Sequence, residues 1–231
     1  MPHAPLFQLD RDLWVVDRPQ SFFGLELGTR MSVVRLRSGR LWLHSPVALD
    51  PQLRAELDAL GLVAFAVAPN RLHHLYAGGV KQSYPQSRLW VAPGLETKRS
   101  DLAIESVLGD DAPEPWRGEI DQVFSRGRPF ENEVVFFHRA TRTLMVCDLA
   151  FHIGPSAPAP TRLLMRALRA YRRLGPTALD RFLVRDFAAA RESLERILAW
   201  DFDRVVVTHG DVVETGGKEK LRAGYGWLLR R

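Results

Sequence analysis

The first part of the chain alternates hydrophobic and polar positions in the way that is typical of β-strands. Valine, leucine and tryptophan recur at alternate positions in residues 12–18 and 31–46, and Ser38-Gly39 supplies a turn within the second stretch. We therefore predict a strand followed by a β-hairpin at the start of a sheet.

The next segments predict a helix and a buried strand. Residues 50–61 place leucines at helical spacing between Asp50, a suitable N-cap, and Gly61, a suitable stop. Residues 62–69 form a short apolar run that ends in proline, which is typical of a strand buried on both faces. A loop over residues 70–79 is expected to follow it.

The second half of the chain repeats this layout. Residues 132–152 hold two apolar runs around a polar turn, so we expect a second hairpin whose far strand ends at Asp148. Two helices and a strand are then expected over residues 161–176, 186–203 and 204–211. The connection over residues 96–116 has no periodicity that assigns it.

Strands precede helices in both halves, and this order favours an α/β fold in which two sheets pack face to face between helices. Such a fold is a four-layer αββα sandwich. The 231 residues are 46% hydrophobic, which is enough to fill a large core. We therefore expect a single domain over residues 1–231.

The chain carries no pattern for export or membrane insertion. Its N-terminus lacks a basic stretch followed by an apolar one, and no window approaches the roughly 18 apolar residues that a membrane span needs. Cys147 is the only cysteine, so neither an internal disulfide nor a thiolate zinc cluster can form. We expect a cytoplasmic protein whose metal site, if it has one, uses histidine and carboxylate ligands.

Side chains that can bind metals follow three of the predicted strands. Residues 70–74 contain His73 and His74, Asp148 ends the second hairpin, and His209 ends the last strand. Rigid scaffolds commonly present functional groups at strand ends. A single histidine in such a place is more often an ordinary loop residue, but three such places together favour a common site.

The order of these segments resembles the metallo-β-lactamase superfamily. In that superfamily an HxHxDH motif follows a buried strand, a bridging aspartate ends a hairpin, and a last histidine lies in a late strand-His-Gly segment. Residues 141–151, TRTLMVCDLAF, resemble the aspartate segment, and residues 204–211, RVVVTHGD, resemble the terminal one. The resemblance implies the αββα fold and a metal-dependent hydrolase.

The HxHxDH segment departs from the pattern of the superfamily. With His74 in its last place, Pro69 and Arg71 stand where the first two histidines belong. His73 then takes the place of the aspartate, and the middle histidine of the superfamily falls near Pro129. These losses fall on one of the two metal sites that the resemblance implies.

The residues that remain correspond to the second metal site, namely His73, His74, Asp148 and His209. Three histidines and one aspartate suit a single zinc or iron ion, so one hypothesis is a mononuclear metal-dependent hydrolase. Iron in such a site could also support oxygen-dependent chemistry. The alternative is a degenerate relative without a metal, which acts as a binding module for a small molecule or a protein.

Three further residues have expected roles around this site. Arg71 would repel a metal ion at close range, or it would bind the anionic part of a substrate. His152 follows Asp148 by four residues and is expected at the mouth of the site, as a second substrate contact. His44 lies where the superfamily often has an Asp-Thr-Gly turn, so it is expected to support the metal ligands.

The net charge of +5 is concentrated in one predicted helix. Five arginines without an acidic residue among them give this helix a cationic face: Arg162, Arg166, Arg169, Arg172 and Arg173. A solvated surface helix, a membrane surface and the capture of an anionic substrate each fit this pattern. Its place after the Asp148 strand favours a small anionic molecule, and no aromatic stacking platform supports nucleic acid as the partner.

Overall fold

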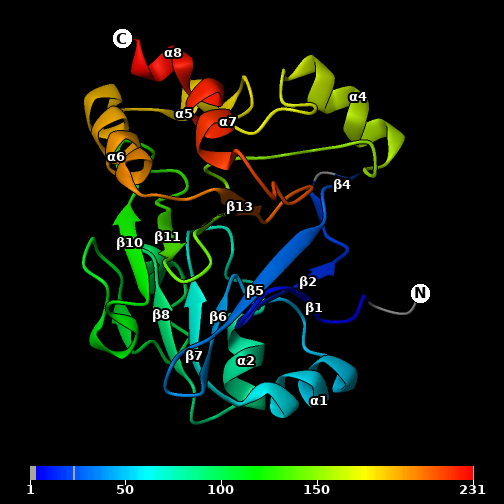
Figure 1. The fold of residues 1–231 in the computed structure, drawn as a ribbon, viewed down its shortest axis with the longest axis vertical. Coiled ribbons are helices and arrows are strands. Elements are labelled where there is room, and N and C mark those ends of the chain that lie inside the picture. The colour runs from blue at the N-terminus through cyan, green and yellow to red at the C-terminus, as the bar shows by residue number, and fades with distance from the viewer. Residues whose placement is uncertain (1–3, 23, 231) are drawn as a thin grey trace.

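Two β-sheets face each other between layers of helices in the computed structural model, which describes residues 4–22 and 24–230 (Figure 1). This is the four-layer αββα arrangement that the sequence predicts. In the described residues, the first sheet has the strand order β1-β2-β5-β6-β7-β8-β9 and the second has the order β10-β11-β12-β13. Strands β6, β7, β8 and β9 run parallel to one another, and β13 runs parallel to β12.

The strands of the first sheet are β1 (Phe7–Asp10), β2 (Leu13–Arg18), β5 (Thr29–Arg35), β6 (Arg40–His44), β7 (Leu62–Ala68), β8 (Arg88–Val91) and β9 (Ser106–Val107). The strands of the second sheet are β10 (Ile120–Phe124), β11 (Val134–His138), β12 (Thr143–Val146) and β13 (Arg204–Val207). A separate pair is formed by β3 (Ser21–Phe22) and β4 (Leu25–Glu26). Both predicted hairpins are present, as the antiparallel pairs β5/β6 and β11/β12.

The helices are α1 (Pro51–Leu60), α2 (Ala77–Ser83), α3 (Leu95–Lys98), α4 (Ala159–Ala167), α5 (Asp180–Leu183), α6 (Phe187–Ala199), α7 (Gly217–Gly224) and α8 (Gly226–Leu229). A short 3₁₀ helix covers Glu114–Trp116. The expected cap of α1 is present, because the Asp50 carboxylate accepts a hydrogen bond from the backbone N–H of Leu53 at 2.8 Å. Asp186 caps α6 in the same way.

Three apolar layers hold the sandwich together. Between the sheets, Trp42 packs edge-on against Trp116 and Phe136 at centroid distances of 6.0 and 5.1 Å. Leucines of α1 and small residues of α2 pack on the outer face of the first sheet. Residues of α6, α7 and α8 cover the second sheet, so each sheet buries both of its faces (Figure 1).

The arginine-rich helix is shorter than the sequence predicts. It ends at Ala167 rather than continuing through the expected range, and Leu163 of the predicted apolar stripe is 69% exposed. Hydrogen bonds to a distant segment explain the early end of the helix. The N–H of Arg172 donates to the carbonyl of Ile153, and Gly175 and Phe151 each donate their backbone N–H to the carbonyl of the other. A continued helix would break these bonds. Among the described residues, none of the helices combines the length and apolar character that a membrane crossing requires.

His138 should make the protein sensitive to acid. Its side chain is buried at the end of β11, and burial lowers the pKa from 6.5 to about 4. The unfolded chain takes up a proton near pH 6.5, whereas the folded protein resists it, so stability falls as the pH drops through this range. We expect unfolding by urea to show that wild type loses about 2–3 kcal/mol more than His138→Gln between about pH 7 and pH 4.5. Equal losses in the two proteins would contradict this assignment.

Candidate metal centre

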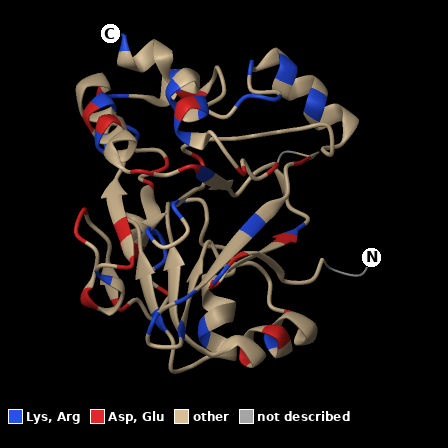
Figure 2. Ribbon diagram, viewed as in Figure 1, with Lys and Arg blue, Asp and Glu red and all other residues tan. Residues whose placement is uncertain are grey.

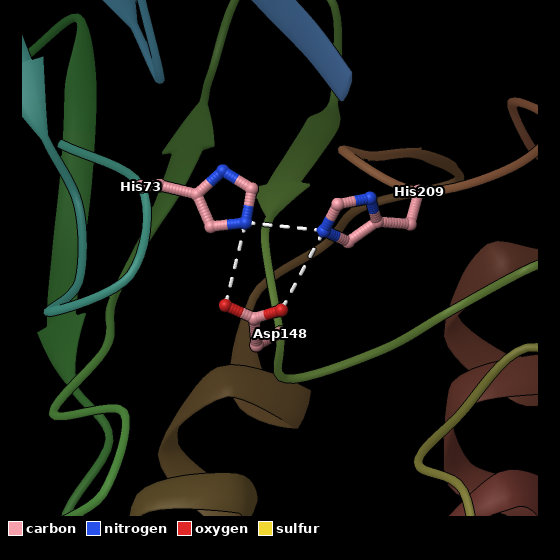
Figure 3. Close-up of side chains that lie close together, drawn as sticks. All are labelled: His73, Asp148 and His209. Atoms are coloured by element: carbon pink, nitrogen blue, oxygen red, sulfur yellow. Dashed lines mark hydrogen bonds and ion pairs between the residues drawn. The ribbon is translucent and has the colours of Figure 1, made fainter. Parts of the chain in front are cut away.

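Three side chains from distant parts of the chain meet at one edge of the sandwich (Figure 3). His73 lies in the loop after β7, Asp148 follows β12 and His209 follows β13. The two histidine Nε2 atoms are 3.1 Å apart, and the Asp148 carboxylate lies 3.3 Å from His73 Nε2 and 3.6 Å from His209 Nε2. All three side chains are at least nine-tenths buried. The structure thus brings together three of the four side chains that the sequence analysis proposed as metal ligands.

A turn built by Asn70 directs His73 into this cluster. The Asn70 Oδ1 atom accepts hydrogen bonds from the N–H groups of Leu72 at 2.9 Å and His73 at 2.7 Å. Its Nδ2 group donates to Asp148 Oδ2 at 2.7 Å. Asn70 is completely buried, so one amide fixes both the backbone of the His73 loop and the carboxylate opposite it.

Glu133 fixes the turn that carries Asp148. Its buried carboxylate accepts hydrogen bonds from three successive backbone N–H groups, those of Cys147 at 2.7 Å, Asp148 at 2.7 Å and Leu149 at 2.9 Å. Asn70 Nδ2 also donates to it at 3.2 Å. Burial and the nearby Asp148 charge raise the pKa of Glu133. The sequence gives little sign of this role, because Glu133 stands at the start of an apolar strand.

A second buried charge lies beneath the same turn. Arg128 Nη2 donates to the Asp148 carbonyl at 3.2 Å and to Glu131 Oε1 at 2.9 Å, and Arg128 Nε lies 2.9 Å from Glu131 Oε2. Arg128 Nη1 donates to the hydroxyl of Tyr225, which itself donates to the Leu149 carbonyl at 2.6 Å. These bonds tie the Asp148 turn to the C-terminal helices.

The segment that carries His209 is held from the first sheet. Arg30, at the start of β5, donates through Nη1 to the carbonyls of Val207 and Gly210, each at 2.8 Å. The Asp17 carboxylate holds this guanidinium at 2.7 Å. His209 Nδ1 is 2.7 Å from the Gly28 carbonyl, so it carries the proton and donates it there.

The ring nitrogens that face away from the cluster determine which nitrogens face into it. His209 donates from Nδ1 to Gly28, which leaves the lone pair of Nε2 directed at Asp148 and His73. His73 Nδ1 lies 3.0 Å from the hydroxyl of Ser45. Histidines that bind metals are usually anchored through the second ring nitrogen in this way. Ser45 therefore takes the supporting position that the sequence analysis gave to His44.

The charges in the cluster are strongly coupled. Burial lowers the pKa of His73, but the charge and hydrogen bond of Asp148 outweigh it, so the pKa lies above 6.5. Burial and the neighbouring His73 lower the pKa of His209 to about 4. Burial raises the pKa of Asp148, yet the two histidines and Asn70 bring it well below its ordinary value. The Asp148 carboxylate is thus ionised between two imidazoles.

The three donor atoms fit a single metal ion. Each offers one ligand atom, and these atoms all lie within 4.8 Å of one another. Ligands about 2.0–2.2 Å from a zinc ion at tetrahedral angles are separated by about 3.3–3.6 Å. The two Nε2 atoms are 3.1 Å apart, and Asp148 approaches His73 through Oδ2 at 3.3 Å and His209 through Oδ1 at 3.6 Å, so each contact is close to that range. Two imidazoles and a carboxylate leave a fourth position free, as catalytic zinc sites do.

His74 and Arg71 do not lie in this cluster. His74 Nδ1 is 2.9 Å from Arg99 Nη1, and burial lowers the pKa of His74 to about 4. The Asn70 turn explains this, because it directs His73 inward and sends the adjacent ring away. Arg71 donates from Nη1 to the Pro129 carbonyl at 3.0 Å and packs beside Gly94. Two of the three positions expected to have lost ligands, Arg71 and Pro129, are thus hydrogen-bonded to each other.

Among the described residues, the side chains of His152 and His44 make no hydrogen bond to the three side chains of the cluster. His152 Nδ1 is 2.9 Å from the Asp211 carbonyl, and its backbone pairs with the His209 segment. His44 is buried and stacks on Trp42 at a centroid distance of 5.7 Å. Its Nε2 atom has no hydrogen-bond partner among the described residues. The metal-ligand and substrate roles of all these residues stay predictions.

The position of His73 shifts the comparison with the HxHxDH motif by one residue. With His73 in the last place, the other three functional places fall on Ala68, Asn70 and Leu72. Only Asn70 among these is polar, and it donates to Asp148 rather than offering a ligand. Sequence reasoning missed the roles of Asn70, Ser45 and Glu133. The polar Asn70 directly after a buried strand was the one available signal.

Comparisons with known proteins agree with the fold. Residues 10–180 match the family described as "Domain of unknown function (DUF4336)", and the chain belongs to that family. A search of curated proteins returns no match.

Several solved structures share the metallo-β-lactamase fold with this chain. The DIM-1 metallo-β-lactamase exposed to ceftazidime is 11% identical, covers 98% of each chain and has a TM-score of 0.68. The FIM-1 metallo-β-lactamase from Pseudomonas aeruginosa, in its mono-zinc form, is 10% identical over 100% of this chain and 94% of its own, with a TM-score of 0.63. The flavodiiron core of Flv1 from Synechocystis sp. has a TM-score of 0.66 at 12% identity, over 97% of this chain and 60% of its own. The chain is thus a divergent member of this fold.

Proposed function

We propose that this protein is a metal-dependent hydrolase with a mononuclear centre formed by His73, Asp148 and His209. The observation that carries the proposal is the convergence of these three buried side chains within ligand distance of one another. Zinc and iron both accept imidazole and carboxylate ligands. A mono-zinc form of FIM-1 and the flavodiiron core of Flv1 on the same fold support either ion.

The protein's own residues would orient the reaction. His73 and His209 present Nε2 because Ser45 and Gly28 engage their Nδ1 atoms, while Asn70 and Glu133 hold Asp148 in place. An ion bound there supplies Lewis acidity, which polarises a carbonyl or phosphoryl oxygen and activates water. Arg71 is bonded to Pro129 and away from the three ligands, so it does not stand in the ion's place.

A cavity next to the His209 segment would receive the substrate. It has a volume of about 700 Å³, and its walls include Gly28 and Gly210 together with Arg18, Asp17 and Ser156. This volume is of the size that small-molecule sites usually have. Charged groups of both signs line it, so we propose a small polar substrate.

Metal content is the direct test. Elemental analysis and zinc titration of the purified protein should give one ion per chain. His209→Ala should weaken zinc binding at least about 100-fold, because one of three ligands is lost. His74→Ala removes a histidine outside the cluster and should change the affinity less than about twofold.

Activity would follow the metal. Hydrolysis of a panel of carboxylic esters, thioesters and phosphodiesters should disappear with a chelator and return with added zinc or iron. A protein that contains no metal, and that gains no thermal stability from zinc or iron, would leave the metal-free binding module as the function. Equal effects of His74→Ala and His209→Ala would instead restore the four-ligand hypothesis.

A further inference from the structure

One stretch of the surface carries a concentration of positive charge. Residues 159–185, which we call the cationic segment, comprise α4, the turn after it and α5. They contain seven arginines: Arg162, Arg166, Arg169, Arg172, Arg173, Arg181 and Arg185. Figure 2 shows α4 with basic positions and no acidic ones. The one acidic residue of the segment, Asp180, accepts a hydrogen bond from the backbone N–H of Thr177 and is partly buried.

These arginines differ from most others in the protein because they lack carboxylate partners. In the described part of the chain, none of the seven forms a salt bridge, whereas Arg139 and Arg204, for example, are paired at 2.7 and 2.8 Å. Arg166 instead lies over the ring of Tyr171, and Arg181 lies over the ring of Trp227. The positive charge of the segment is therefore not neutralised within the protein.

Large apolar side chains are exposed among these charges. Leu163 is 69% exposed, Leu179 is 57% exposed and Phe182 is 76% exposed. Met165 is buried on the inner side of α4, while Leu163 and Arg166 are neighbours at i and i+3 on its outer side. The N–H of Ala178 donates to the carbonyl of Leu168 at 2.8 Å, so the residues just before α5 lie beside the end of α4.

The turn between the helices holds two arginines in an unfavourable backbone conformation. Arg169 and Arg172 have φ values of 58° and 54°, in the left-handed region that favours glycine or asparagine. Both side chains are exposed. Glycine at either position would relieve the backbone, so these two arginines carry a conformational cost that glycine would avoid.

We propose that the cationic segment docks onto an anionic lipid bilayer. Unpaired arginines gain from the negative surface potential of such a membrane, and the exposed Leu163 and Phe182 gain from burial below the headgroups. A nucleic-acid surface would use the arginines but would leave these apolar side chains in water. Arg166 covers one face of the Tyr171 ring, and Phe182 is the exposed aromatic ring of the segment, so the segment lacks the series of aromatic side chains on which successive bases stack.

The test is co-sedimentation of the full chain with lipid vesicles. Vesicles of phosphatidylcholine mixed with phosphatidylglycerol should bind the protein, and vesicles of phosphatidylcholine alone should not. The triple variant Arg166→Glu/Arg169→Glu/Arg172→Glu should bind the anionic vesicles about 100-fold more weakly. A matched control, Arg40→Glu/Arg54→Glu/Arg117→Glu, changes the net charge equally at exposed arginines that also lack salt bridges, and should lose much less.

Further measurements separate the membrane from other partners. Leu163→Ser/Phe182→Ser should weaken binding to anionic vesicles and leave any binding to DNA or RNA unchanged. Zinc affinity equal to that of wild type would show that each variant is folded. Equal losses in the two triple variants, or binding to nucleic acid in preference to vesicles, would overturn the proposal.

Discussion

Glu133→Ala is expected to lower the free energy of unfolding by at least about 3 kcal/mol, because three buried backbone N–H groups lose their acceptor at a cost of about 1–3 kcal/mol each. The groups belong to Cys147, Asp148 and Leu149, and Asn70 loses a partner as well. Urea unfolding measures the loss. Zinc affinity should fall about 10–100-fold in the same variant, since the turn that holds Asp148 is released.

Two variants control this result. Glu133→Gln keeps one oxygen as an acceptor and should recover part of the stability. Glu195→Ala removes an exposed glutamate paired with Arg191 on α6 and should cost less than about 1 kcal/mol. A Glu133→Ala protein as stable as Glu195→Ala would show that the Asp148 turn forms without the carboxylate.

Arg128→Met should destabilise the protein by about 3–5 kcal/mol, because it leaves the buried Glu131 without its partner. Both side chains are at most 5% exposed, so water cannot replace the lost bonds. The double variant Arg128→Met/Glu131→Leu removes both charges, and it should lie within about 2 kcal/mol of wild type. Thermal or urea unfolding of wild type, Arg128→Met, Glu131→Leu and the double variant completes the cycle.

The outcome of this cycle separates two roles for Arg128. Recovery in the double variant means that the loss reflects an unpaired buried carboxylate. Failure to recover would mean that the bonds of Arg128 to the Asp148 carbonyl and to Tyr225 dominate instead.

Most of the fold could be predicted because local signals agree with tertiary structure. Three local signals each predict the element that the structure contains. These signals are the alternation in β2, β5 and β6, the Asp50 cap of α1 and the apolar run of β7. The cationic segment behaves differently. The spacing of its leucines favours a long helix, but the β-bridge between Phe151 and Gly175 prevents the helix from continuing despite its helix propensity. Helix α2 escaped prediction because its sequence, AGGVKQS, contains two glycines.

The candidate site could be located from the sequence but not assigned residue by residue. Strand ends placed Asp148 and His209 correctly at the cluster, and adjacent histidines made the third choice ambiguous. The Asn70 turn determines that His73 rather than His74 points inward. The pattern of hydrophobic and polar residues does not predict the geometry of this turn. The side chains of Ser45, Glu133 and Arg30 hydrogen-bond to partners 28, 15 and 180 residues away in the sequence, namely His73, Asp148 and Gly210. Local sequence patterns do not predict such distant contacts.

Arg30 of the first sheet and Gly28 just before it are hydrogen-bonded to the His209 segment of the second sheet. An ion bound by the cluster would therefore link the two halves of the molecule. His73 and His209 are 136 residues apart, and they belong to loops of different sheets. An ion that binds only when the two sheets are packed together stabilises the folded protein relative to any state in which the sheets have separated. Its main kinetic effect should then be slower unfolding, since contacts of such long range form late. We therefore expect metal-loaded protein to resist proteolysis for longer than metal-free protein, with little change in its folding rate.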